Sequence, residues 1–385
     1  MPRPTAWLIM LLLAGAARAE MPTDLALPLD CEPGASCWVL RYVDHDPGPG
    51  ATDYACGPVT GDGHKGTDFA LRDLAVMAQG VEVRAAAAGV VDALRDGVPD
   101  VSVEEGGREA IAGKECGNAI RIAHGDGWTT WYCHLRRGSL MVAEGDRVEV
   151  GQPLALVGLS GETSFPHLHF DVRRGEEPID PFVGLQREGS CGPGPQPLWR
   201  ADVMAALDYQ PVVLTNAGVA TAAPEMDDVG RGWHQQASLP VTAPALVLWV
   251  EGYWVEAGDR VRLTLAGPDG IPVVDRTVAL EKPWKHWFQF AGARRPGDAW
   301  PAGTYAGEIT LERAGQERTT AQTSIELIEL SAPVTEVQQP ASTPATESRS
   351  TAASVPSYIW TIVVAAVFIA VLVVVLVWRV AMTRP

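Results

Sequence analysis

The sequence predicts a mostly β protein with two folded regions, a disordered stalk and one C-terminal membrane-spanning helix. Three observations predict this arrangement. Short β-branched runs alternate with Gly-containing turns between about residues 60 and 185, and a strict apolar alternation returns after residue 259. A stretch rich in Ser, Thr, Ala, Pro and Glu then precedes twenty uncharged residues, 359–378.

The N-terminus has the three parts of a secretory signal peptide, which we assign to residues 1–19. Arg3 is followed by an apolar run, and Ala17-Arg18-Ala19 forms a small-residue cleavage site. The sequence therefore predicts export from the cytoplasm. Residues 20–59 are rich in Pro, Gly and Asp and are expected to form an irregular N-terminal extension.

Residues 60–188 are expected to form a compact antiparallel β domain. No amphipathic helix pattern interrupts the β-branched runs, which favours antiparallel pairing. An acidic, Gly-rich stretch at 95–114 is expected to be a long loop. The predicted strands are 81–84, 89–94, 119–123, 148–150, 153–157 and 167–172.

All six cysteines follow the signal peptide, and an even number in an oxidising compartment predicts three disulfides. Residues 118–124 and 128–135 are expected to pair around a Gly-Asp-Gly turn, which brings Cys116 and Cys133 nearly opposite each other. We therefore predict that bridge and leave the pairing of the other four cysteines open.

Residues 189–200 form a Gly- and Pro-rich linker, and residues 201–330 are expected to form a β-sandwich similar in outline to immunoglobulin-like modules. Residues 259–265 alternate strictly between apolar and polar, and residues 305–312 alternate again. Such a module suits a protein partner. Residues 331–357 lack large apolar groups and predict a disordered stalk.

Residues 358–379 are expected to form a transmembrane helix, with a cytoplasmic tail at 380–385. At ~1.5 Å per residue the uncharged segment spans ~30 Å, the thickness of a bilayer core. Tyr358, Trp360 and Trp378 stand at interfacial positions, whereas a buried core helix needs no such aromatics. The sequence thus predicts a single-pass membrane protein whose body lies outside the cytoplasm, on the periplasmic face of the inner membrane.

The charge balance argues against nucleic acid as a partner. The chain has 30 basic and 47 acidic residues, a formal net charge of −17. Phosphate binding requires clustered Lys and Arg, which this sequence lacks.

Four histidines and one aspartate of the first domain suggest a catalytic metal site. His64 and Asp68 are four residues apart, and His134 lies on a predicted strand. His167 and His169 are two apart, so on a strand both imidazoles face one side. Two neutral imidazoles, one carboxylate and an open fourth position make a catalytic zinc site, where bound water becomes acidic near pH ~7.

At these residues the chain resembles the lysostaphin-type, or LytM-type, zinc metalloendopeptidases that cut peptidoglycan peptides. The resemblance covers roughly residues 60–173. It implies that His64, Asp68 and His169 hold one zinc ion and that His134 and His167 are catalytic. The resembling segments are 63–69, 117–118, 120–124, 132–135, 145–148, 151–152 and 166–170.

The resemblance implies a membrane-anchored zinc metalloendopeptidase that hydrolyses peptide bonds in peptidoglycan. The alternative is a non-catalytic LytM-like scaffold that binds or activates other wall hydrolases, and it would lack metal ligands, whereas none is missing here. A third hypothesis is a zinc peptidase whose substrates are proteins, such as Gly-rich chains. Digestion of purified sacculi separates the first hypothesis from the third.

Overall fold

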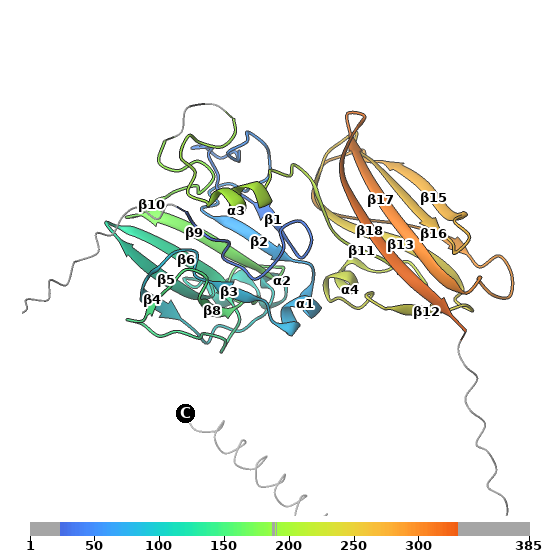
Figure 1. Cartoon of the computed structure of the whole chain (residues 1–385), viewed down its shortest axis with the longest axis horizontal. Helices are drawn as coiled ribbons and strands as arrows, with labels where there is room; N and C mark the ends of the chain where they lie inside the picture. The colour runs from blue at the N-terminus through green and yellow to red at the C-terminus, as the bar shows by residue number, and fades with distance from the viewer. Residues whose placement is uncertain (1–23, 187–188, 190, 330–385) are drawn as a thin grey trace, which may run out of the picture. The chain divides into compact units, whose positions relative to one another are not determined.

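The computed structural model describes residues 24–186, 189 and 191–329. The fold is mostly β, as the sequence predicts, with a few short helices (Figure 1). We call residues 24–207 the N-terminal β region and residues 212–328 the C-terminal β region. Both belong to one compact unit of the chain.

The N-terminal β region is built on one antiparallel sheet. The strand order is β1-β2-β9-β6-β5-β4-β7, with β10 paired to β9, so β2 and β9 are neighbours although about a hundred residues separate them. Strands β3 and β8 form a second, two-stranded sheet. The bounds are β1 Cys37–Arg41, β2 Thr67–Leu71, β3 Glu82–Arg84, β4 Gly89–Arg95, β5 Asn118–Gly125, β6 Trp128–Leu135, β7 Arg147–Val148, β8 Pro153–Leu156, β9 His167–Arg174 and β10 Glu177–Pro178.

The two faces of this sheet differ in chemistry because side chains alternate along each strand. Asp68 on β2 pairs with His169 on β9, and both point to one face. Their neighbours Phe69, Leu168 and Phe170 are fully buried in the core on the other face. This register places polar residues in a row across the strands. We call this side of the sheet the polar face.

The core of the N-terminal β region extends beyond the predicted domain limits. Residues 20–59 are not irregular throughout, since β1 joins the sheet and Leu25 and Leu29 are buried in its core. Trp199, Val203 and Leu207 pack into the same core, although the sequence assigned them to the linker and to the second domain. Gly- and Pro-rich composition marks turns, and it does not show against which core the flanking apolar residues pack.

The predicted loop at 95–114 contains two short helical turns. They are α2, Val103–Gly106, and the 3-10 helix η1, Arg108–Ile111. A further helix that the sequence did not predict, α1 at Leu74–Gln79, begins at Asp73, whose carboxylate accepts from the Val76 amide. A short helix α3 spans Ala201–Ala206.

The C-terminal β region contains two sheets that share one core. The first sheet has the order β11-β13-β16 and the second β12-β18-β17-β14-β15, with β12 parallel to β18. The likeness to immunoglobulin modules stays a prediction. The bounds are β11 Val213–Ala220, α4 Met226–Gly230, β12 Ser238–Pro240, β13 Ala245–Val255, β14 Arg260–Ala266, β15 Pro272–Ala279, β16 Trp284–Arg294, β17 Gly303–Arg313 and β18 Gln316–Ile328.

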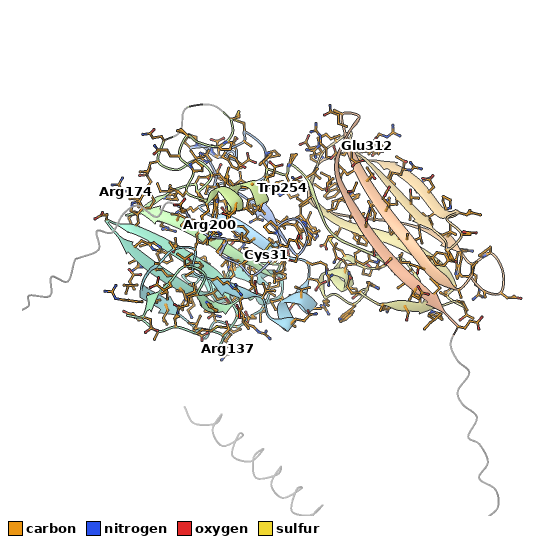
Figure 2. All side chains as sticks on the ribbon, viewed as in Figure 1. Cys31, Arg137, Arg174, Arg200, Trp254 and Glu312 are labelled. Carbon is orange, nitrogen blue, oxygen red and sulfur yellow. A yellow bond between two sulfur atoms is a disulfide. The ribbon has the colours of Figure 1, made fainter. Side chains whose placement is uncertain are left out.

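Side chains of β13 contact the N-terminal β region directly. Trp254, labelled in Figure 2, donates from its indole Nε1 to the Leu40 carbonyl oxygen at 2.7 Å. Leu40, Ala70 and Val213 form a small buried cluster against which Tyr253 packs. The indole has a polar partner when buried, as indole N–H groups usually require.

Three disulfides use all six cysteines. Cys116–Cys133 forms as the hairpin register predicts, and the structure adds Cys31–Cys37 and Cys56–Cys191. The last of these links residues 135 apart in sequence.

None of the helices in the described ranges combines the length and apolar character needed to cross a bilayer. The predicted signal peptide at 1–19, stalk at 331–357, transmembrane helix at 358–379 and tail at 380–385 lie outside the described residues.

Candidate metal centre

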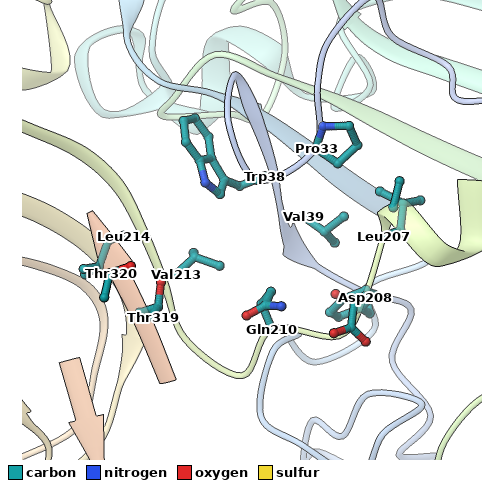
Figure 3. Close-up of a pocket in the computed structure, with 13 residues that line it drawn as sticks. Pro33, Trp38, Val39, Leu207, Asp208, Gln210, Val213, Leu214, Thr319 and Thr320 are labelled. Carbon is teal, nitrogen blue, oxygen red and sulfur yellow. The ribbon is translucent and has the colours of Figure 1, made fainter. Parts of the chain in front are cut away.

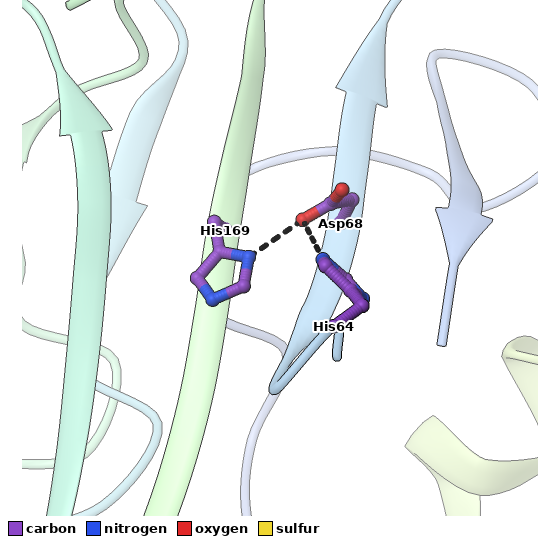
Figure 4. A group of neighbouring side chains, drawn as sticks. All are labelled: His64, Asp68 and His169. Carbon is purple, nitrogen blue, oxygen red and sulfur yellow. Dashed lines mark hydrogen bonds and ion pairs between the residues drawn. The ribbon is translucent and has the colours of Figure 1, made fainter. Parts of the chain in front are cut away.

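Three side chains from two distant stretches of chain converge on the polar face (Figure 4). Asp68 Oδ1 lies 3.1 Å from His64 Nε2 and 2.8 Å from His169 Nδ1. All three candidate ligand atoms lie within 4.8 Å of one another. Tetrahedral zinc with bonds of about 2 Å separates its ligand atoms by ~3.3 Å, so these side chains are already close to a coordinating arrangement.

Local backbone contacts aim the two imidazoles. His64 precedes β2, and its Nδ1–H donates to the Tyr42 carbonyl oxygen at 2.7 Å, which directs Nε2 toward Asp68. Gly66 allows the turn to approach β9, because a Cβ there would lie 2.8 Å from the His169 ring. A ring nitrogen held by a backbone carbonyl is the usual way in which proteins orient a metal-binding histidine.

The electrostatics of this group favour a cation. Asp68 is 1 % exposed, and among the described residues its ion-pair partners are imidazoles only. Burial alone would raise the pKa of Asp68, but His64, His167 and hydrogen bonds from the ligand histidines hold it well below its usual value. Burial would likewise lower the pKa of His64, and the Asp68 carboxylate outweighs this and raises it. A buried carboxylate beside two imidazoles is a donor set that zinc binds, so these residues fit one zinc ion.

Two further imidazoles, His134 and His167, face the same group without belonging to it. Their ring centroids lie 4.6 Å apart, and His134 lies 6.1 Å from His169. His134 Nδ1–H donates to the Ser160 carbonyl at 2.8 Å, and His167 Nδ1 lies 3.0 Å from the Phe165 carbonyl. Both rings therefore carry their proton on Nδ1 and leave Nε2 free to accept one.

Both of these histidines are held in the neutral form. Burial and the neighbouring His167 and His169 lower the pKa of His134 well below its usual value. Burial lowers the pKa of His167 to about 4, although the Asp68 carboxylate opposes the shift. Neutral imidazoles at pH 7 can act as proton acceptors.

An unusual backbone conformation at His134 places its ring on the polar face. Strict alternation would point His134 into the core with Tyr132, whose hydroxyl accepts from the Ala86 amide there. Instead His134 has φ +61°, in the left-handed region. Its amide donates to the Cys116 carbonyl at 2.9 Å, and the Cys116–Cys133 disulfide lies beside it. These contacts hold a conformation that costs about 1–2 kcal/mol for a non-glycine residue.

The comparisons with known proteins agree with this geometry. Residues 62–181 match the model of peptidase family M23. An M23-type domain therefore occupies residues 62–181 of the chain. This M23 domain contains all five predicted site residues, and it excludes β1 and α3, which complete the core in this chain.

The relatives that the M23 domain matches include proteins named as peptidases and proteins named as activators of wall hydrolases. The DD-carboxypeptidase/endopeptidase Mpg of Neisseria meningitidis serogroup B is 34% identical over 118 residues, which cover 31% of this chain and 22% of Mpg. The murein hydrolase activator EnvC of Escherichia coli K12 is 37% identical over 71 residues, which cover 18% of this chain and 16% of EnvC. The chain thus spans less than a quarter of the length of either relative.

Among solved structures, the catalytic domain of lysostaphin from Staphylococcus simulans is similar to part of this chain. The alignment covers 37% of this chain and 85% of the lysostaphin domain, at 23% identity and a TM-score of 0.24.

The structure gathers every predicted site residue at one place on the M23 domain. Sequence reasoning missed the groups that orient them, the carbonyls of Tyr42, Phe165 and Ser160, because a backbone oxygen leaves no signal in residue identity. It also missed Asp171, two residues after His169 on the same strand face. The Oδ1 atom of Asp171 is buried without a hydrogen-bond partner among the described residues. The strand alternation 167, 169, 171 was a usable signal for it.

Three of the four remaining histidines have hydrogen-bond partners in the described structure. His124 bonds the Ala88 carbonyl and Thr130, His45 bonds Asp180, and His286 bonds Glu251. None of them belongs to a metal-ligand group in the described part of the chain.

Two cavities lie near the contact between the β regions. The smaller, of about 270 Å³, is lined by Trp38, Val39 and Leu207 of the N-terminal β region and by Val213 and Thr320 (Figure 3). It includes no residue of the candidate metal centre.

Proposed function

We propose that this protein is a zinc metalloendopeptidase that hydrolyses peptide bonds in peptidoglycan. The observation that carries the proposal is the completeness of the site. Three ligand side chains converge, and two neutral imidazoles with free Nε2 atoms face the same group. A binding site for a structural ion would need the ligands and would not need the two additional imidazoles.

Each side chain has one role in this proposal. His64 Nε2, Asp68 and His169 Nδ1 hold the zinc ion, which would supply Lewis-acid activation of the scissile carbonyl and of water. Nε2 of His134 or His167 takes the proton of the attacking water and returns it to the departing amine.

The names of the relatives support the substrate class. Mpg is named a DD-carboxypeptidase/endopeptidase and EnvC a murein hydrolase activator. We further propose that the catalytic body is exported and anchored by the apolar segment at 359–378, with the body in the periplasm. An anchored enzyme would work on the wall layer next to its membrane.

Digestion of purified sacculi by the full chain tests this function. We expect soluble peptide-containing fragments whose new termini show cleavage of a peptide bond. A zinc chelator should abolish the release, and added zinc should restore it. Intact sacculi after incubation with the zinc-loaded chain would contradict the proposal, and cleavage of Gly-rich protein chains alone would move the substrate class to proteins.

The second candidate is a scaffold that activates other wall hydrolases, and the similarity to EnvC favours it. The complete ligand set favours the enzyme, because a scaffold has no need of a metal. Zinc analysis of the purified chain separates the two functions when it is combined with the digestion. Stoichiometric zinc with cleavage supports the enzyme, whereas absence of both zinc and cleavage supports the scaffold.

A further inference from the structure

Arg41 lies at the end of β1, the edge strand of the sheet, and outside the residues that match the M23 model. The register shifts between Val39 and Arg41, so that Val39 pairs with Phe69 and Arg41 with Asp68. Without this bulge Leu40 would stand opposite Asp68. Bulges commonly re-aim a side chain beside a functional site.

The bulge places Arg41 on the polar face in line with the metal ligands. Residues directly opposite in an antiparallel pair point the same way, with Cβ atoms about 4.5–5.5 Å apart. Arg41, Asp68 and His169 therefore form one row across β1, β2 and β9. Burial and a nearby carboxylate have the largest effects on the pKa of His167 and on that of Tyr253. The positive charge of Arg41 lowers both pKa values, as expected for a guanidinium close to both side chains.

A cleft of about 780 Å³ leads away from this row. Arg41, Phe165 and Pro166 line it on the N-terminal side, and Tyr253 and His286 line it on the C-terminal side. Phe165 stacks on the ring of His167 with centroids 4.5 Å apart, so a wall residue of the cleft packs against the proposed catalytic histidine. Tyr253 stacks on His286, also at 4.5 Å. The Trp254–Leu40 hydrogen bond joins the two walls.

The acidic residues that line the cleft outnumber the basic ones, so the overall field of the cleft does not favour an anion. Several of these acids already have partners. Asp73 pairs with Arg72 at 2.8 Å, Glu251 with His286 at 2.7 Å, and Asp100 accepts from backbone amides. Arg41 differs, because no carboxylate in the described residues lies within ion-pair distance of its guanidinium. A half-buried, unpaired guanidinium beside a metal site has the geometry to bind a carboxylate by two parallel hydrogen bonds.

We propose that Arg41 binds a carboxylate of the substrate peptide, one or two residues from the scissile bond, in the cleft that Tyr253 and His286 close. This inference rests on the proposed peptidase function and names its substrate class as an acidic peptide. One residue of extended peptide covers about 3.3–3.6 Å. One or two residues of substrate therefore span the distance from the metal ligands on β2 and β9 to Arg41 on the neighbouring strand β1. The C-terminal β region then forms one wall of the substrate cleft.

Two synthetic peptides that differ only in a carboxylate or carboxamide next to the scissile bond test the assignment. Binding to the full, zinc-loaded chain is measured by calorimetry, and cleavage is measured as kcat and KM. The wild type should prefer the acid by roughly 10- to 100-fold in Kd, the range for a charge-assisted hydrogen bond. Arg41→Met should abolish the preference and Arg41→Lys should retain part of it.

Arg147→Met is the matched control, since Arg147 is an exposed guanidinium on β7 that has no ion-pair partner among the described residues. It should keep the full preference. Equal Kd values for acid and amide in the wild type, or an unchanged preference in Arg41→Met, would overturn the assignment. If Arg41→Met does not fold, the wild-type peptide pair and Arg41→Lys still decide it.

The two proposals fail in different ways. A wild type that binds the acid more tightly and leaves both peptides intact contradicts the peptidase and keeps the carboxylate site. A wild type that cleaves acid and amide with equal kcat/KM contradicts the carboxylate site and keeps the peptidase.

Discussion

His169 and Asp68 stand opposite each other on β9 and β2, with His169 Nδ1 2.8 Å from Asp68 Oδ1. Two ligands of the candidate metal centre are therefore fixed by strand pairing rather than by a mobile loop. A rigid pair of this kind reduces the reorganisation needed when a cation binds.

Removal of one paired ligand should remove the metal. We expect the His169→Ala chain to hold no zinc, where the wild type holds one ion per chain, because two protein ligands do not retain zinc at a catalytic site. Mass spectrometry of the purified, dialysed protein measures this. His234→Ala is the control, since His234 lies outside the metal group and should keep the full zinc content. Equal zinc in wild type and His169→Ala would remove the assignment of this residue.

Removal of the neutral imidazole of His134 should leave the zinc content unchanged and lower the activity. His134→Ala should retain zinc, because His134 Nδ1 bonds Ser160 and its ring is not a ligand. Its kcat should fall by about 10²–10⁴-fold, the usual contribution of general acid–base catalysis. Zinc analysis and turnover on the same preparation check this. Loss of zinc together with activity would mean that His134 supports the metal instead.

The acid limb of the pH profile should lie below the range of an ordinary histidine. Burial lowers the pKa of His167 to about 4 and that of His134 well below its usual value. A lowered pKa keeps the accepting Nε2 unprotonated as the pH falls through 6.5, and a cation nearby would lower it further. With zinc in excess, kcat measured from pH 4 to 8 should hold at pH 6. An acid limb centred at 6.5 or above contradicts this.

The site residues were predictable from sequence because their signals are local. His167 and His169 show their common face by a spacing of two, and the hairpin turn near residue 125 places Cys116 opposite Cys133. The bulge that turns Arg41 toward Asp68 depends on the partner strand. The left-handed conformation of His134 depends on contacts with Cys116. Long-range contacts of this kind leave no periodicity in the chain, so sequence reasoning could not find them.

The same distinction applies to the core. Trp199 and Val203 follow a Gly- and Pro-rich stretch that predicts a boundary, yet they pack under the first sheet. The apolar character of these residues was visible in the sequence. The core that they join was decided by the path of the chain after β10.

The three disulfides should stabilise the fold in the order of the loops they close. The cysteines are 6, 17 and 135 residues apart in Cys31–Cys37, Cys116–Cys133 and Cys56–Cys191. Loop-closure entropy predicts losses of about 2, 3 and 5 kcal/mol when each pair is replaced by alanine. Urea unfolding of the three double variants measures the order. A larger loss for the shortest loop than for the longest would show that the entropic account does not hold here.

A methyl group at residue 66 should disturb the metal centre, although it replaces none of the three ligand side chains. A Cβ on Gly66 would lie 2.5 Å from the Phe170 carbonyl oxygen and 2.8 Å from the His169 ring, so β9 or the imidazole must move. Displaced ligand support typically lowers metal affinity by about 10- to 100-fold. Competition with a zinc chelator should show this loss in Gly66→Ala. Gly61→Ala is the matched control, because nothing lies within 4 Å of a Cβ there, and its zinc affinity should equal that of the wild type. If both variants bind zinc as tightly as the wild type, the close approach of this turn to His169 has no part in holding the metal.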